Sequence, residues 1–261
     1  SLTFFIPLLL LSYAIINQTY QQIQKGKQAQ ASLVLVNDVL GLADKAAMYR
    51  DLASVDILYS RQTLKDQADK VESDLYKAAS KLANEYRGKL IAAELDNRLP
   101  DWKKRLARSG ENLQPTVSDQ FKTYNKVVQD IIHLAEKAAN ESGLSQDTSE
   151  QVQILSKLIL VDYPGYMKSM GFAHTMGIFS ALEQYLKTST YDVLNDTFDE
   201  VDLAIKTMKQ QHSELIKADP LYADKFKSIF TQNEKGFEDI LFKLDEEIIS
   251  AISVNSKWGD L

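Results

Sequence analysis

The sequence predicts an all-α protein, an elongated antiparallel helical bundle. Glycine and proline are scarce, with ten and five in 261 residues, so long helices with short connections are favoured. Apolar residues recur at intervals of three and four through most of the chain, which is the period of an amphipathic helix. No stretch of useful length alternates apolar and polar residues, as a half-buried strand would.

Composition narrows the class of protein. The chain is 44% hydrophobic and 25% charged, as is usual for a folded globular protein. The absence of cysteine excludes disulfides and zinc–thiolate sites. A net charge of −6 does not fit a nucleic-acid-binding surface, so we expect no nucleic-acid partner.

An uncharged segment, residues 1–24, opens the chain, and its first part reads "LTFFIPLLLLSYAII". Fifteen helical residues span about 23 Å, whereas a membrane-spanning helix needs about 20 residues. The segment is therefore either the core of a signal peptide or the end of an N-terminal transmembrane helix. We favour the transmembrane helix because no small-residue cleavage site follows.

Helical periodicity continues over residues 25–257, and the breaks are few. A short segment at 98–116 contains two prolines and a glycine, and "DYPGY" predicts a helix break near 163–165. Pro220 follows an aspartate, a pair typical of a helix start. The six helices that the sequence predicts are 10–60, 64–97, 117–141, 147–187, 192–217 and 220–257.

The lengths of the first and last helices predict how the bundle is assembled. A helix of some fifty residues is about 75 Å long. It would serve two four-helix-bundle modules stacked end to end, with the long first and last helices shared and shorter helices filling each module. After the last helix, Lys257 and Trp258 resemble residues at a membrane interface, so 258–261 are expected to start a second membrane anchor.

The stretch "AAMYRDLASV" places Arg50 in an apolar helical stripe. Arg61 lies three helical turns further on at nearly the same angle, and Tyr49 and Ser54 are close by. A guanidinium that faces a bundle interior can hold a small carboxylate or oxyanion through two hydrogen bonds. These four residues are therefore candidate ligand-binding residues. The alternative is an arginine that forms a surface pair with Asp51 or Asp44, or one that is satisfied by a neighbouring helix.

A second candidate region reads "DYPGYMKSMGFAHTMG". Its glycines predict close helix approach, and Tyr163, Tyr166 and His174 are candidate ligand-binding residues. A histidine here is able to donate to an anion, although it is equally able to serve as a partly buried, hydrogen-bonded residue.

Motifs for other chemistry are missing from the sequence. The three histidines are scattered without metal-ligand spacing, so no metal site is predicted. The chain has no glycine loop for phosphate and no G-x-S-x-G nucleophile motif. We therefore expect a protein that is not an enzyme and that needs no cofactor.

The order of segments resembles the helical extracytoplasmic sensor domains of bacterial transmembrane receptors. An apolar helix precedes "LVLVNDVLGLADKAAMYRDLASVDILYS", and "MGFAHTMGIFSALEQYLKTSTYDVL" follows about 120 residues later. Similar domains, of the nitrate/nitrite-sensing and helical bimodular types, occur in chemoreceptors, sensor histidine kinases and diguanylate cyclases. Their second segment usually reads G-x-x-R-x-x-G, and this chain has His174 in place of that arginine.

The resemblance implies a ligand-binding sensor region of a transmembrane signalling receptor. Its ligand would be a small anion or polar molecule, and the receptor would be a homodimer in the bacterial inner membrane with its body in the periplasm or outside the cell. Binding would shift a helix, and this shift would be transmitted across the membrane to an output domain. The alternative interpretation is a membrane-anchored helical bundle that binds a protein partner without sensing a small molecule.

Overall fold

A computed structural model describes most of the chain. Within the described residues, the regular structure is helical throughout, with seven α-helices and no strand, which confirms the predicted all-α class. The segment expected to start a second membrane anchor, 258–261, lies outside them. The described residues are 5–59, 61–141, 150–183, 188–218 and 231–250 apart from 233, 237 and 240.

The helices fall into two groups along the chain. The first group is α1 (Phe5–Tyr59), α2 (Gln62–Glu85), α3 (Leu90–Leu106) and α4 (Val117–Glu141), with a short 3-10 turn, η2 (Gly110–Asn112), before α4. The second group is α5 (Glu150–Lys157), the π-helical segment η4 (Leu158–Asp162), α6 (Tyr163–Glu183), α7 (Thr188–Ala218) and a second π-helical segment, η5 (Asp245–Ile249).

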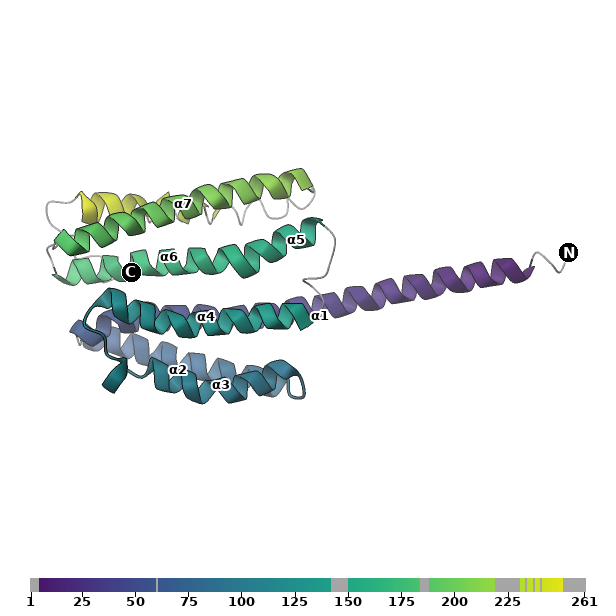
Figure 1. Cartoon of the computed structure of the whole chain (residues 1–261), viewed down its shortest axis with the longest axis horizontal. Helices are drawn as coiled ribbons and strands as arrows, with labels where there is room; N and C mark the ends of the chain where they lie inside the picture. Colours follow the sequence, from purple (N-terminus) through teal and green to yellow (C-terminus); the bar gives the residue numbers. More distant parts are fainter. Residues whose placement is uncertain are drawn as a thin grey trace.

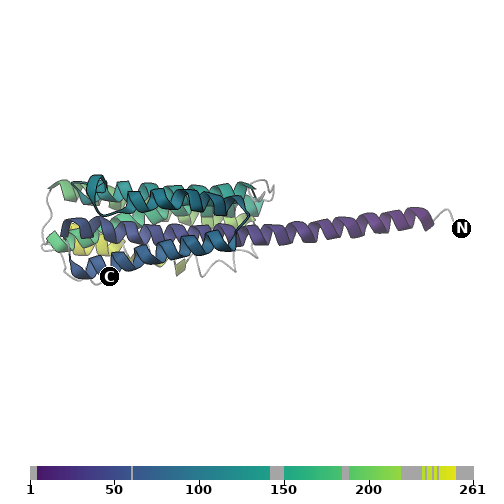
Figure 2. The ribbon, with the colours of Figure 1, turned by 90° about the horizontal axis from the view of Figure 1, so that it is seen from below.

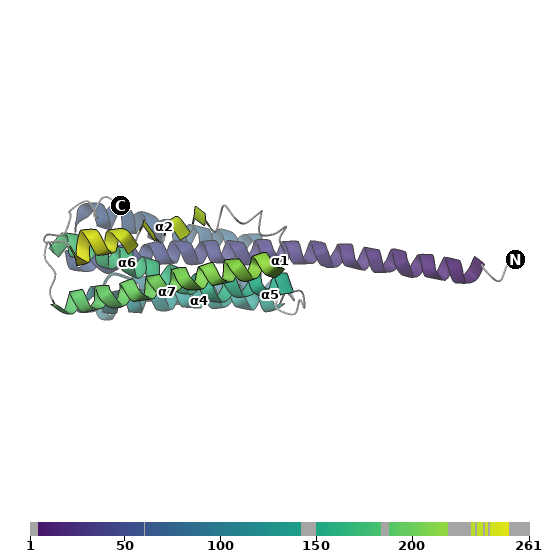
Figure 3. The ribbon, with the colours of Figure 1, turned by 90° about the horizontal axis from the view of Figure 1, so that it is seen from above.

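The two groups lie side by side. Helices α1–α4 form a four-helix bundle, and α5, α6 and α7 run along its flank (Figures 1 and 2). Helix α1 packs against α2, α4 and α6, so it belongs to both groups. We expected two modules stacked end to end, but the described helices of both groups instead lie beside the same stretch of α1. Figure 1 shows α7 and the segment around η5 on the far side of α6 from the first bundle, and Figure 3 shows this flanking layer from above.

The N-terminal part of α1 extends beyond all the other helices (Figure 1). At 1.5 Å per residue, the 55 residues of α1 span about 80 Å, close to the length expected from the sequence. Among the residues that the structure describes, no helix meets the length and apolarity needed to cross a bilayer.

The expected helix 64–97 is divided in two. The chain turns at Tyr86–Lys89, where Gly88 has φ = +90°, and α3 returns along α2. Only glycine adopts this backbone conformation readily. The prediction missed the turn because Leu82, Tyr86 and Leu90 keep helical spacing through it.

The two predicted proline breaks have different outcomes. Pro100 lies inside α3, which continues to Leu106 with Trp102 buried, so the expected break at residue 98 is wrong. The irregularity expected near 163–165 occurs one turn earlier, in the π-helical segment η4. A π turn holds one extra residue and relaxes the helix before Pro164, whose ring would otherwise clash with the preceding turn.

Buried apolar residues form two main clusters. The larger cluster fills the α1–α4 bundle and includes Val39, Leu75, Leu95 and Ile131. The second cluster joins the end of α1 to α2, α4, α6 and α7. The apolar face of α7 is buried, with Leu194, Val201, Ile205 and Met208 all enclosed, as expected for an amphipathic helix.

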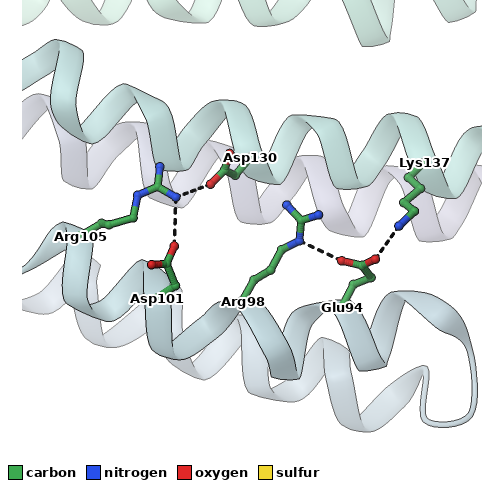
Figure 4. Close-up of polar contacts among 6 residues, drawn as sticks. All are labelled: Glu94, Arg98, Asp101, Arg105, Asp130 and Lys137. Atoms are coloured by element: carbon green, nitrogen blue, oxygen red, sulfur yellow. Dashed lines mark hydrogen bonds and ion pairs between the residues drawn. The ribbon is translucent and has the colours of Figure 1, made fainter.

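Ion pairs join α3 to α4 along the surface of the bundle (Figure 4). Glu94 accepts hydrogen bonds from Lys137 of α4 and from Arg98, and Arg105 donates to Asp101 and to Asp130 of α4. The hydrogen bonds from Lys137 and Arg98 lower the pKa of the Glu94 carboxyl.

We expect Lys137→Met to raise the pKa of Glu94 toward its ordinary value, because Arg98 alone then holds the carboxylate. A carboxyl with a lowered pKa stabilises the fold above its ordinary pKa, and this contribution is lost as the pH falls through the lowered pKa. Because both side chains are partly exposed to solvent, the variant should lose less than about 1 kcal/mol of unfolding free energy. An NMR titration of the Glu94 side chain measures the shift, with Lys126→Met as the control. An unchanged pKa would contradict the pairing.

Candidate functional site

Arg50 is fully buried where α1, α4 and α6 meet. Its Nε donates to Oδ1 of Asp51 at 2.7 Å, and Nη1 donates to Oδ1 of Asn125 on α4 at 2.6 Å. Nη2 donates to the backbone carbonyl of Met167 on α6 at 3.2 Å. Each guanidinium nitrogen therefore bonds to the protein, and one charged group ties the four-helix bundle to its flanking layer.

Two further neighbours enclose the guanidinium. The ring of Phe121 lies beneath it, with the Arg50 Cζ atom 4.2 Å from the ring centroid, a cation–π contact. Gly171 of α6 lies on the other side. A β-carbon at residue 171 would overlap Arg50 Nη2 and lie 2.7 Å from both carboxylate oxygens of Asp51. The predicted close helix approach therefore occurs at Gly171.

Asp51 forms the boundary between this buried cluster and solvent. Its side chain is 15% exposed, and Oδ1 accepts from Arg50. Among the described residues no hydrogen-bond donor reaches Oδ2. Burial raises the pKa of Asp51 above its ordinary value, and this effect exceeds the opposing effects of Arg50 and His174. The carboxylate is thus poorly solvated for a charged group and retains capacity to accept hydrogen bonds.

A cleft of about 450 Å³ opens beside Asp51, between α1, α2 and α6. A volume of this size falls within the range of small-molecule sites. Three apolar side chains form its walls, and the remaining five are polar or charged. The residues that line it are Met48, Asp51, Leu52, Gln67, Lys70, Val71, Asp74 and His174.

His174 lies in this cleft, and so the structure brings it close to the Arg50 region, 124 residues earlier in the sequence. On the next residue, the Thr175 hydroxyl donates to the backbone carbonyl of Asp51 at 3.4 Å. Arg50 itself lies behind Asp51, held by neighbouring helices, as in the alternative left open by the sequence. Ser54 supports the same turn, since its hydroxyl donates to the Arg50 carbonyl at 2.5 Å.

The other predicted residues lie elsewhere. Tyr49 is buried inside the first bundle, and its hydroxyl donates to the Leu106 carbonyl at 2.6 Å. Arg61 is exposed in the turn before α2, because α1 ends at Tyr59 and the angular match with Arg50 is lost. Two tyrosines of α6 bond to other helices: Tyr163 donates to Asp44 at 3.3 Å, and Tyr166 donates to Gln211 at 2.9 Å.

The sequence prediction missed the α2 side of the cleft. Gln67, Lys70 and Asp74 are spaced by three and four residues, so they share one exposed face of the helix. Polar residues with this spacing also occur on ordinary solvated helix faces. Only the packing of α2 beside Asp51 and His174 distinguishes them.

Comparison of the chain with protein-family models, with curated proteins and with solved structures found no match. Within the described part of the chain, no group of three or more histidine and acidic side chains is placed to hold a metal ion. The chemistry of the cleft is therefore argued from its own side chains.

Proposed function

We propose that the chain is the ligand-binding sensor region of a bacterial transmembrane signalling receptor. A small polar molecule binds in the cleft between α1, α2 and α6 and stabilises one packing of the bundle against its flanking layer. A shift of a long helix then passes the signal across the membrane. The fragment itself is not an enzyme.

One observation supports this proposal most strongly. The cleft contains Asp51, and Asp51 bonds to the buried Arg50 that joins α1, α4 and α6. A ligand at Asp51 therefore acts on the contact that positions the flanking layer against the four-helix bundle. Binding energy that differs between two packings is what shifts a conformational equilibrium.

The remaining parts of the proposal concern topology. The uncharged N-terminal segment, residues 1–24, is the end of a membrane helix, and the body lies in the periplasm or outside the cell. The second module consists of α5 and α6, α7 and the segment around η5, and it shares α1 with the first module. The receptor is a homodimer, and the extension of α1 beyond the bundle leaves its N-terminal part accessible to a second copy (Figure 1).

A second candidate function is a helical bundle that binds a protein partner. Large apolar side chains on the flanking layer favour it: Val161, Leu203 and Phe242 are each more than 60% exposed. Such a protein would use these faces and would leave the cleft empty.

A thermal-unfolding screen of the 261-residue chain in mild detergent tests the sensor proposal. The panel contains organic acids, nitrate, nitrite, amines and amino acids. A ligand that binds only the folded state raises the unfolding temperature as its concentration increases. At one hundred times its Kd, the ligand stabilises the folded state by about 2.7 kcal/mol. For a chain of this size, that corresponds to a shift of roughly 5–10 °C.

A pair of tryptophan variants on α2 locates the binding. Gln67→Trp fills the cleft and should abolish the shift, whereas Ser80→Trp, at an exposed position of α2 that does not line the cleft, should leave the shift intact. A compound that stabilises both variants equally binds elsewhere and would overturn the cleft assignment. No shift with any compound would overturn the sensor proposal in favour of the protein-binding bundle.

A further inference from the structure

The charges in the cleft define what it is able to bind. Asp51 lies in front of Arg50, so the cleft presents a carboxylate where the sequence predicted a guanidinium. On the α2 side, Lys70 and Asp74 are exposed, and neither forms an ion pair with the described residues. The cleft is therefore lined by two carboxylates and one ammonium group, together with the Gln67 amide and the His174 imidazole.

From this arrangement we propose that the ligand is a small molecule with a protonated primary amine, of the amino-acid class. This inference rests on the proposed ligand-binding function of the same cleft. The ammonium group donates to Oδ2 of Asp51, the carboxylate oxygen that has no donor among the described residues, and to Asp74. An ammonium group has three donors, which suits two carboxylates approaching from different helices.

Lys70 determines the second feature of the ligand. It lies one turn before Asp74 on the same face of α2, so a carboxylate on the ligand reaches Lys70 while the ammonium group reaches the acidic side chains. A second ammonium group would meet Lys70 and be repelled. Met48, Leu52 and Val71 provide apolar contact for the methylene groups between the two ends.

A ligand with only negative charge fits the cleft poorly. Its carboxylate would approach Asp51, which is buried and already short of solvation, and like charges repel more strongly in such surroundings than in water. To reach Arg50, an anion would have to displace Asp51 from the guanidinium and enter a space closed by Phe121 and Gly171.

A matched set of four-carbon compounds tests this inference: 4-aminobutanoate, putrescine and succinate. Calorimetric titration of the 261-residue chain in mild detergent measures the Kd of each compound. We expect 4-aminobutanoate to bind, putrescine to bind more weakly because of Lys70, and succinate not to bind. Asp74→Asn should weaken binding of 4-aminobutanoate by about tenfold, the usual effect of losing a charged hydrogen bond.

Asp96→Asn is the matched control, because it makes the same charge change at an exposed position of α3, a helix that contributes no residue to the cleft. It should leave the Kd unchanged, and since Asp74 is exposed as well, neither variant is expected to disturb folding.

Binding of succinate without 4-aminobutanoate would overturn the amine assignment and leave the sensor proposal standing. Failure of all three, together with an empty thermal screen, would overturn both. Equal effects of the two variants would place the amine outside the cleft.

Discussion

Gly171→Ala is expected to lower the free energy of unfolding by about 3 kcal/mol. The added β-carbon would overlap Arg50 Nη2 and crowd both oxygens of Asp51, and Asn125 and Phe121 leave the guanidinium no free space to enter. Overpacking of a buried site usually costs 1–3 kcal/mol, and disturbing a buried ion pair adds to that cost. The gain in helix propensity from glycine to alanine, about 1 kcal/mol, is too small to offset it.

Urea unfolding followed by circular dichroism measures this change. Gly165→Ala is the control, because Gly165 lies on the same helix and a β-carbon there meets no atom within 4 Å. That variant should be neutral or should gain up to about 1 kcal/mol. Equal stability of the two variants would contradict the close packing of α6 on Arg50.

Arg50→Ala should be the most destabilising single substitution on α1, with a loss of about 3–5 kcal/mol. Removing one partner of a buried ion pair leaves the other charged, and here Asp51 would lose its main favourable contact. Asn125 and the Met167 carbonyl would also lose their donors, and a cavity would open above Phe121. We further expect the pKa of Asp51 to rise, because only desolvation and the weaker effect of His174 would remain.

Arg98→Ala provides the comparison for this variant. Arg98 also pairs with an acidic side chain, but it is 32% exposed and lies on the surface of α3. Its loss should cost less than about 1 kcal/mol. Similar losses for Arg50→Ala and Arg98→Ala in denaturant unfolding would show that the buried cluster contributes no more than a surface ion pair.

The helical periods predicted the fold class and several helix ends, including both ends of α4, because amphipathic spacing reflects burial directly. They failed at the turn Tyr86–Lys89, where the positive φ of Gly88 lets the chain reverse while the apolar spacing continues on both sides. They failed again at Pro100, since α3 tolerates a proline while Trp102 and Leu106 pack into the core. The local spacing of apolar residues, glycine and proline does not show how strongly contacts with distant residues stabilise a segment.

In the candidate site, too, the sequence predicted the locally unusual residues and missed the partners that distant packing supplies. Sequence reasoning found Arg50 and His174, because a charge in an apolar stripe and a histidine between two glycines are unusual locally. It did not find Asn125 or the Met167 carbonyl as partners of Arg50, since these lie 75 and 117 residues away. The α2 face of the cleft was missed because its residues look like any solvated helix surface.

Histidine NMR tests the central claim, that a small polar ligand binds beside Asp51, most directly. The chain has three histidines, of which only His174 lines the cleft. A histidine-selective isotope label therefore gives three ring signals, which His→Gln substitutions assign. On titration with a compound that raises the unfolding temperature, the account predicts a saturable shift of the His174 signal, with those of His133 and His212 unchanged. A saturable shift of His133 or His212 while His174 stays fixed would contradict it.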